Sequence, residues 1–202
     1  MTFTIAVTGS VASGKSTAVN FFADKGISII SADDINRDLL EPNTATFSAI
    51  VSHFGQDMIT DEGHLNKKLL RDIIFTNQHE KQWLESLLHP IIRSNMADKI
   101  TSTTGPYTII EIPLLKSKED YPYINRVLLV EVDEPVQIKR LMARDECSYN
   151  QAKAIINNHT PYTEKRKIAD DIVTNNKTKT DFFEQLESLH RQYIVLSKCR
   201  ST

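Results

Sequence analysis

The chain has 202 residues, with 24 basic and 26 acidic side chains and a formal net charge of −2. This length fits one domain that carries an insertion, and the near-neutral charge argues against partners such as nucleic acid or a membrane surface. No window approaches the ~18 apolar residues of a membrane span. The N-terminus lacks the basic region of a signal peptide, and Cys147 and Cys199 fit no metal spacing. We therefore expect a cytoplasmic protein with two free thiols.

Short apolar runs rich in β-branched residues predict the strands of a parallel sheet. Each run is nearly continuous rather than alternating, which is typical of strands buried on both faces. Helical patterns lie between the runs, one of them ending before Gly26, and the alternation indicates an α/β doubly wound layer. We expect a parallel sheet of five strands flanked by helices, with its core over 1–40, 105–133 and 168–202; the glycine-containing loop from Gly9 to Ser16 after the first strand makes it of the P-loop NTPase type. The predicted strands cover 3–8, 27–30, 107–112, 127–132 and 172–174.

Two segments interrupt this alternation. Residues 41–104 show only helical patterns, so we expect a helical insertion between the strands of the sheet. His89-Pro90 predicts the end of one of its helices. Residues 134–167 are polar, with Pro135 expected as a first helical residue and Ser148-x-x-Gln151 matching a capping box. We expect two helices there that form a movable lid. The helices expected in the insertion cover 46–54, 65–75, 80–88 and 91–100.

A phosphate-binding loop is the most specific motif. The eight residues from Gly9 to Ser16 match G-x-x-x-x-G-K-[ST], between a buried strand and a helix. Backbone N–H groups of such a loop surround an anion, and the helix N-terminus adds a positive dipole. Lys15 would reach the β- and γ-phosphates and Ser16 would bind Mg²⁺; the alternative is a glycine-rich turn that happens to precede a helix. The expected nucleotide ligands here are Gly9, Val11, Ala12, Ser13, Gly14, Lys15, Ser16 and Thr17.

Carboxylates at the ends of two other strands are candidates for catalysis. Asp33 and Asp34 follow the second run, at the sheet edge where parallel sheets bind ligands. Asp33 could accept a proton from an attacking hydroxyl, or either residue could cap the next helix. Glu111 ends the third run and could support Mg²⁺ or Lys15. No N-K-x-D or D-x-x-G motif is in place, which argues against a GTPase switch.

Two arginines of the lid segment are candidate phosphate ligands. Arg140 and Arg144 are spaced i, i+4 and would share one helix face. The alternative is a solvated helix on which they pair with acidic neighbours such as Asp145. Lys139 and the run 165–167 are typical of surface charge, although Lys165 could face the cleft. His89 is a candidate ligand, or a structural cap.

The arrangement of these residues resembles the dephospho-CoA kinase family through most of the chain. The order and spacing of the matching motifs are far more specific than the phosphate-binding loop alone. The motifs are Thr8-Gly9 to Ser16, Ser31-Ala32-Asp33-x-Ile35-x-Arg37 with Glu41-Pro42, Leu88-His89-Pro90-x-Ile92, Pro113-Leu114-Leu115, Arg126-Val127, Arg140 with Arg144, and Ala169-Asp170-Asp171-x-Val173-x-Asn175.

The resemblance implies transfer of the γ-phosphoryl group of ATP, with Mg²⁺, to the ribose 3′-hydroxyl of dephospho-CoA, the last step of coenzyme A synthesis. It implies that Asp33 is the base, that Arg140 is the lid arginine and that Asn175 lies near the adenine. It also implies that the helical insertion, 41–104, binds the acceptor substrate. Arg37 and His89 fall in motifs that we expect on the acceptor side. The alternatives are another small-molecule P-loop kinase and a nucleotide-binding module without turnover. No heptad pattern predicts an oligomeric state.

The chain departs from the family pattern at a few positions. Ser10 and Ala12 stand where glycine is common, so the loop should keep a backbone conformation there that an L-residue tolerates. Ser31 replaces the first carboxylate of the usual Asp-Ala-Asp, and His159 replaces a glutamine in the lid. None of these changes removes Lys15 or Asp33.

Overall fold

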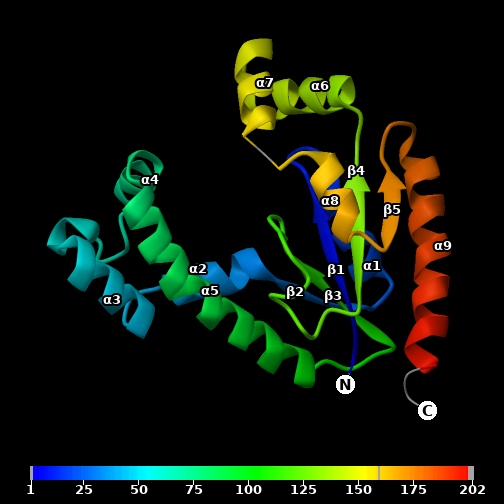
Figure 1. Cartoon of the computed structure of the whole chain (residues 1–202), viewed down its shortest axis with the longest axis horizontal. Helices are drawn as coiled ribbons and strands as arrows, with labels where there is room; N and C mark the ends of the chain where they lie inside the picture. The colour runs from blue at the N-terminus through cyan, green and yellow to red at the C-terminus, as the bar shows by residue number, and fades with distance from the viewer. Residues whose placement is uncertain (1, 159, 200–202) are drawn as a thin grey trace. The chain divides into compact units, whose positions relative to one another are not determined.

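A parallel sheet of five strands is the centre of the computed structural model, which describes residues 2–158 and 160–199 (Figure 1). The strand order is β2-β3-β1-β4-β5, and the predicted strands are confirmed to within a few residues. Every pairing is parallel, so the carboxyl ends of the strands share one edge. The strands are β1 (Phe3–Gly9), β2 (Ser28–Ser31), β3 (Tyr107–Glu111), β4 (Arg126–Glu131) and β5 (Asp171–Thr174).

The central strand is covered by two helices, α1 (Lys15–Asp24) and α9 (Lys179–Lys198). All seven residues of β1 are buried, as its continuous apolar run predicts. Phe22 of α1 and Tyr193 of α9 pack against the sheet in one apolar core. Gly26 follows α1 with a φ of +78°, a left-handed conformation that suits the glycine expected at the end of this helix.

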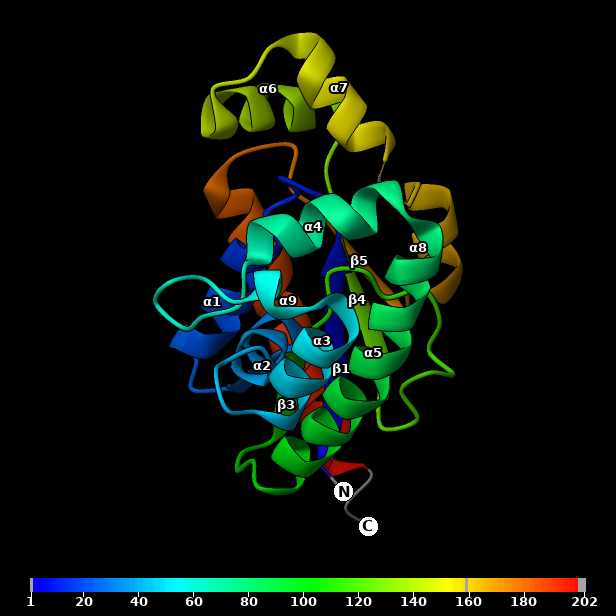
Figure 2. The ribbon, with the colours of Figure 1, turned by 90° about the vertical axis from the view of Figure 1, so that its left-hand side faces the viewer.

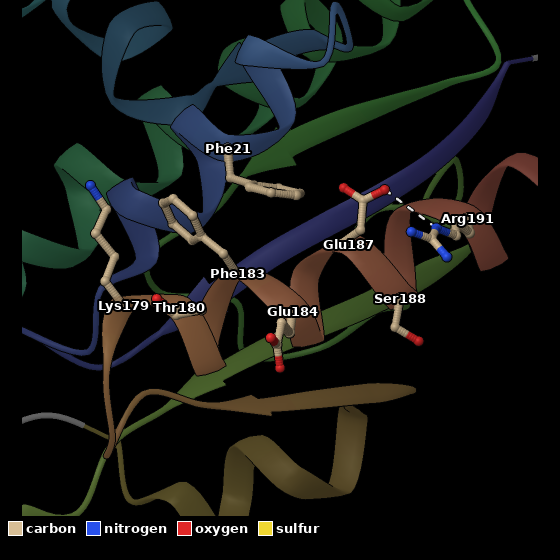
Figure 3. Close-up of a pocket in the computed structure, with 8 residues that line it drawn as sticks. All are labelled: Phe21, Lys179, Thr180, Phe183, Glu184, Glu187, Ser188 and Arg191. Atoms are coloured by element: carbon tan, nitrogen blue, oxygen red, sulfur yellow. Dashed lines mark hydrogen bonds and ion pairs between the residues drawn. The ribbon is translucent and has the colours of Figure 1, made fainter.

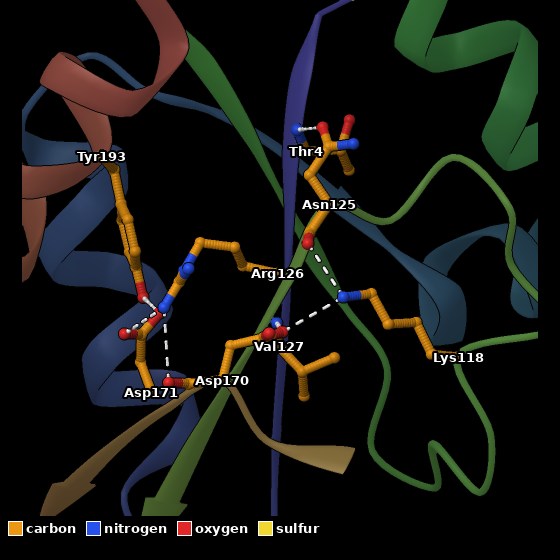
Figure 4. Close-up of polar contacts among 8 residues, drawn as sticks. All are labelled: Thr4, Lys118, Asn125, Arg126, Val127, Asp170, Asp171 and Tyr193. Carbon is orange, nitrogen blue, oxygen red and sulfur yellow. Dashed lines mark hydrogen bonds and ion pairs between the residues drawn. The ribbon is translucent and has the colours of Figure 1, made fainter. Parts of the chain in front are cut away.

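A polar network fixes β5 against β4 and α9 (Figure 4). The guanidinium of Arg126 donates to both carboxylate oxygens of Asp171, at 2.8 and 2.9 Å. The Tyr193 hydroxyl donates to the same carboxylate at 2.9 Å. Asp170 accepts from the Val127 N–H at 2.8 Å. These contacts set the register in which Leu128 lies opposite Asp171, and they account for two motifs that carry the family resemblance.

A surface groove of about 730 Å³ lies between α1 and α9 (Figure 3). The rings of Phe21 and Phe183 form part of its wall, with centroids 5.3 Å apart. Glu187 pairs there with Lys25 at 2.6 Å and with Arg191 at 3.3 Å. No residue that the sequence predicts as a ligand lines this groove.

Residues Ala32–Asp98 form a second compact unit, and the remainder of the chain, up to Ser31 and from Lys99, forms the first. The second unit is helical, as expected for an insertion, but it begins at Ala32 rather than at residue 41 (Figure 2). Its core includes Ile50, Leu70 and Leu88, and His53 stacks on Trp83 at 3.7 Å between ring centroids. Its elements are α2 (Ala32–Leu39), α3 (Ala45–Phe54), η1 (Gln56–Met58), α4 (Lys67–Thr76) and most of α5 (Gln78–Thr101).

The break predicted at His89-Pro90 is wrong. One helix, α5, runs through both residues, although Pro90 has no N–H for the carbonyl of Ser86. The apolar stripe explains why the helix continues: it recurs every four residues on both sides of the proline, so tertiary packing outweighs the local penalty. The stripe consists of Leu84, Leu88, Ile92, Met96 and Ile100.

The described residues of the lid segment, 134–158 and 160–167, form three helices rather than the two expected: α6 (Glu134–Asp145), α7 (Tyr149–Asn157) and α8 (Tyr162–Ile168). Pro135 is the second residue of α6, and the capping box of Ser148 and Gln151 is confirmed. The third helix lies against β4 (Figure 1). The sequence does not predict α8 because a helix of seven residues is too short to show a periodic apolar pattern.

Two further expectations concern the whole chain. Cys147 and Cys199 are free thiols. In the described part of the chain, no helix combines the length and the apolar character needed to cross a bilayer.

Replacing Arg126 should weaken the fold, because the nearly buried carboxylate of Asp171 loses its cation and keeps only the Tyr193 hydroxyl as a donor among the contacts of this network. Arg126→Met should lower the free energy of unfolding by about 2 kcal/mol. Arg191→Met removes an exposed pair with Glu187 and should change it by less than about 0.5 kcal/mol. Urea unfolding followed by circular dichroism measures both. Equal stabilities of the two variants would contradict the role of the network.

Candidate active site

The phosphate-binding loop connects β1 to α1 and needs glycine at both of its motif positions. A Cβ on Gly9 would lie 2.8 Å from the carbonyl oxygen of Val130. Gly14 has a φ of +96°, and a Cβ there would lie 2.2 Å from the Asn175 side-chain nitrogen. The motif glycines are therefore required by close packing behind the loop as well as by its turn.

Two side-chain amides hold the loop from behind. Gln137 Nε2 of α6 donates to the carbonyl oxygen of Val11 at 2.7 Å. Asn175 Nδ2, at the end of β5, donates to the carbonyl oxygen of Ser13 at 2.9 Å. With these oxygens held on the outside, the loop can present its N–H groups to an anion. Gln137 is 1% exposed, and its contact also attaches the base of the lid segment to the loop.

Ala12 adopts the left-handed conformation that an L-residue avoids. Its φ is +56°, which contradicts the expectation that the alanine keeps the loop in a commonly tolerated geometry. A left-handed L-residue costs roughly 1 kcal/mol, so the loop bears this strain at the position where glycine is common in the family. Ser10, the other departure, is buried and accepts from Lys165, as described below.

Lys15 is paired with Glu111 in this structure. Its Nζ lies 2.6 Å from Glu111 Oε1, and both side chains are mostly buried. The prediction that Glu111 supports Lys15 is therefore confirmed as a direct ion pair. Ser16 is exposed and Thr17 half-buried in the first turn of α1, where a helix presents unpaired N–H groups.

Arg140 contacts the loop through Asn175, whereas Arg144 does not. Arg140 Nη2 donates to the Asn175 carbonyl oxygen at 2.9 Å and to its Oδ1 at 3.2 Å. Arg144 pairs with Asp145 at 2.6 Å on the surface, and that bond raises the pKa of the guanidinium. This is the alternative that the sequence left open, and a nucleotide-binding role for Arg144 stays a prediction.

Buried donors without partners indicate what the site accepts. Arg140 Nη1 and the Ser13 hydroxyl are buried and have no hydrogen-bond partner in the described structure. Buried polar groups are rarely left unpaired, so these atoms fit a site completed by an anion. Within residues 2–158 and 160–199, no cluster of three or more His, Cys, Asp or Glu side chains is arranged to hold a metal, and binding of Mg²⁺ by the exposed Ser16 stays a prediction.

Three predicted residues lie in the second unit. Asp33 is exposed in the first turn of α2, which begins at Ala32, so it does not occupy the capping position. Arg37 pairs with Asp34 at 2.9 Å. His89 is exposed in the interior of α5 and therefore caps no helix end.

Several contacts of the site could not be predicted. Gln137 carries no motif, and no pattern predicts that Asn175 holds the loop from behind; its position near the adenine, which the family resemblance implies, stays a prediction. Lys165 is 2% exposed and donates to the Ser10 hydroxyl at 3.3 Å. Burial, and secondarily the charge of Lys15, lower the pKa of Lys165 to about 8. His159, a departure in the lid, lies outside the described residues.

Gly14→Ala should impair ATP binding, since the new methyl group displaces Asn175 and with it the support of Ser13. We expect the dissociation constant for ATP to rise at least tenfold, about 1.4 kcal/mol. Gly26→Ala is the matched control, because Gly26 is also left-handed but has open space around it. It should cost about 1 kcal/mol of stability and no ATP affinity. Calorimetric titration and thermal melts separate the two effects, and equal ATP affinities would contradict the packing argument.

Sequence comparisons with known proteins show the family to which the chain belongs. The family model for dephospho-CoA kinase matches residues 3–181. A curated dephospho-CoA kinase from Vibrio cholerae is 42% identical over 199 residues, covering 98% of both chains. One from Legionella pneumophila (strain Paris) is 40% identical over 200 residues, covering 99% of this chain and all of the relative.

Solved structures of other proteins are similar to this chain over nearly its whole length. A dephospho-CoA kinase from Campylobacter jejuni has a TM-score of 0.72 and 28% identity over 98% of both chains. TT1252 from Thermus thermophilus is 24% identical and has a TM-score of 0.81, covering 95% of this chain and 97% of its own. A gluconokinase from Sinorhizobium meliloti is 15% identical and has a TM-score of 0.51, covering 96% of this chain and 95% of its own. These last two share the fold. With a family model that spans most of its length and full-length relatives at about 40% identity, the chain belongs to the dephospho-CoA kinase family.

Proposed function

We propose that the chain transfers the γ-phosphoryl group of ATP to the ribose 3′-hydroxyl of dephospho-CoA, giving coenzyme A and ADP as the last step of coenzyme A synthesis. One observation carries the proposal for these residues. In a chain of this family, the phosphate-binding loop and Arg140 are joined through a single residue, Asn175. The loop that binds the phosphates and the arginine that neutralises them are thus positioned together.

Charge stabilisation of the transferring phosphoryl group falls to Lys15 and Arg140. A phosphate oxygen would replace Glu111 as the partner of Lys15, and Arg140 Nη1 offers a donor that has no partner among the described residues. These groups would offset the charge on the equatorial oxygens of the transition state. Mg²⁺ bound with ATP would be held by the Ser16 hydroxyl and would supply further neutralisation of the β- and γ-phosphates.

Asp33 is the proposed base. In the transfer, the 3′-oxygen forms a bond to the γ-phosphorus, the bond to the bridging oxygen of ADP breaks, and the hydroxyl proton passes to the Asp33 carboxylate. Chain connectivity supports this role: Ser31 pairs in register with Glu111, the partner of Lys15, and Asp33 follows two residues later. We place Arg37 and His89 on the acceptor side, as the family motifs predict.

Exclusion of water is the proposed role of the lid segment, because an exposed γ-phosphate would otherwise react with water. The cytoplasmic location and the nucleotide contacts of Thr17 and Arg144 stay predictions. The test of the function is ADP release with ATP, Mg²⁺ and a panel of dephospho-CoA, adenosine and AMP, with products identified by mass. Coenzyme A as the preferred product supports the proposal. Preference for adenosine or AMP indicates another small-molecule kinase, and ATP binding without turnover indicates a module without activity.

Asp33→Asn should lower kcat by about 10²-fold or more, because the amide cannot take the hydroxyl proton. The affinity for ATP should stay within about threefold of wild type, since the carboxylate acts on the acceptor. Asp38→Asn, an exposed carboxylate of the same helix, is the matched control and should keep wild-type kcat. Steady-state kinetics and ATP titration give both quantities. A near wild-type kcat for Asp33→Asn would remove Asp33 from the mechanism.

Arg140→Met should reduce kcat for dephospho-CoA by roughly 10²-fold, as for the loss of one preorganised donor. Lys139→Met removes the neighbouring exposed charge and should leave kcat within about twofold. Rapid-quench measurement of a single turnover isolates the chemical step. If both variants react at the same rate, Arg140 serves only to hold Asn175.

A further inference from the structure

The basic run at the end of the lid segment divides into two paired residues and one unpaired residue. Arg166 donates to both oxygens of Glu131 at 2.7 Å, and Lys167 pairs with Glu164 at 2.8 Å. Lys165 points the other way and is 2% exposed. Its ammonium donates to the Ser10 hydroxyl at 3.3 Å, and no carboxylate of the described residues forms an ion pair with it.

An ammonium in this position is unfavourable unless something else compensates it. Burial of a charge without a counter-ion costs several kcal/mol, and one contact with a neutral hydroxyl offsets little of that. The positive charge of Lys15 repels the Lys165 ammonium. The carboxylate of Glu111 is paired with Lys15 and forms no ion pair with Lys165. The structure therefore keeps a second lysine beside the phosphate-binding loop at a cost to its own stability.

The place of Lys165 indicates which ligand compensates it. Ser10 is the second residue of the phosphate-binding loop, and it lines a cavity of about 270 Å³ together with Gln137 and Tyr162. The Lys165 ammonium thus contacts a residue, Ser10, that itself lines the cavity beside the loop. Two of the unpartnered buried polar atoms, Ser13 Oγ and Arg140 Nη1, belong to this loop and to the arginine that Asn175 joins to it. Cations and unpaired donors around one loop fit a polyanion such as a triphosphate.

We propose that Lys165 is a second phosphate-binding lysine of this loop, which releases Ser10 and contacts the terminal phosphates of ATP when the nucleotide binds. The proposal rests on the proposed use of ATP but not on the identity of the acceptor. Ser10 would hold the ammonium in the free protein, which accounts for a serine at a loop position where glycine would give no such contact.

Calorimetric titration with ATP and with AMP, without acceptor, tests the proposal. Lys165→Met should raise the dissociation constant for ATP about tenfold or more, as for a lost charge-assisted contact, and that for AMP less than about twofold. Lys167→Met, an exposed lysine of the same helix, is the control and should bind ATP as wild type does. If Lys165→Met does not fold, Lys165→Gln removes the charge and keeps a donor for Ser10.

Two further measurements separate ligand binding from a structural role. Ser10→Gly removes the resting contact with Lys165 and a side-chain hydrogen bond with Tyr162, but no charge, so its loss of ATP affinity should be much smaller than that of Lys165→Met. At pH 8.5, titration in two buffers of different ionisation enthalpy should show proton uptake in wild type, because a bound phosphate raises the pKa of Lys165 from about 8, and none in Lys165→Gln.

Three results would overturn the proposal: ATP affinity within twofold of wild type in Lys165→Gln, equal losses for ATP and AMP, or a loss in Ser10→Gly as large as in Lys165→Met. Because no acceptor is present, these outcomes are independent of the proposed function. A protein that binds ATP through Lys165 but does not phosphorylate dephospho-CoA would refute only the latter.

Discussion

The structure depends on how the carbonyl oxygens of the phosphate-binding loop are held. A peptide unit that turns its N–H toward an anion must turn its carbonyl oxygen away, and a buried carbonyl needs a donor on that side. Gln137 supplies the donor for Val11 and Asn175 the donor for Ser13. One amide comes from the lid segment and the other from the end of β5. The loop therefore keeps its shape only while both neighbouring elements are in place.

This dependence extends to residues far from any phosphate. Arg126 and Asp171 fix the register of β5 at one end of the strand, and Asn175 follows its other end. A slip of one residue would turn the Asn175 side chain to the opposite face and leave Ser13 without its donor. The Arg140 guanidinium donates to both the side-chain oxygen and the backbone carbonyl oxygen of Asn175. The network in Figure 4 is thus a structural support of the site.

The sequence predicts those parts of the protein that a local pattern encodes. Continuous apolar runs predict the strands, and the spacing of Gly9, Gly14 and Lys15 predicts the loop, because each property depends on neighbouring residues. Pro90 is misleading, since its effect on α5 depends on packing along the whole helix. The contacts of Gln137 and Lys165 join residues 126 and 155 positions apart, and no local pattern encodes such pairs.

The ion pair between Lys15 and Glu111 has a consequence for which anions occupy the loop. Any ligand must compete with a carboxylate that is already in contact with the ammonium and is covalently part of the protein. An anion that contacts Lys15 alone has to replace this partner, whereas an anion that also reaches the loop amides and the helix N-terminus gains further contacts to offset the exchange. The pair with Glu111 therefore favours anions large enough to span the whole loop.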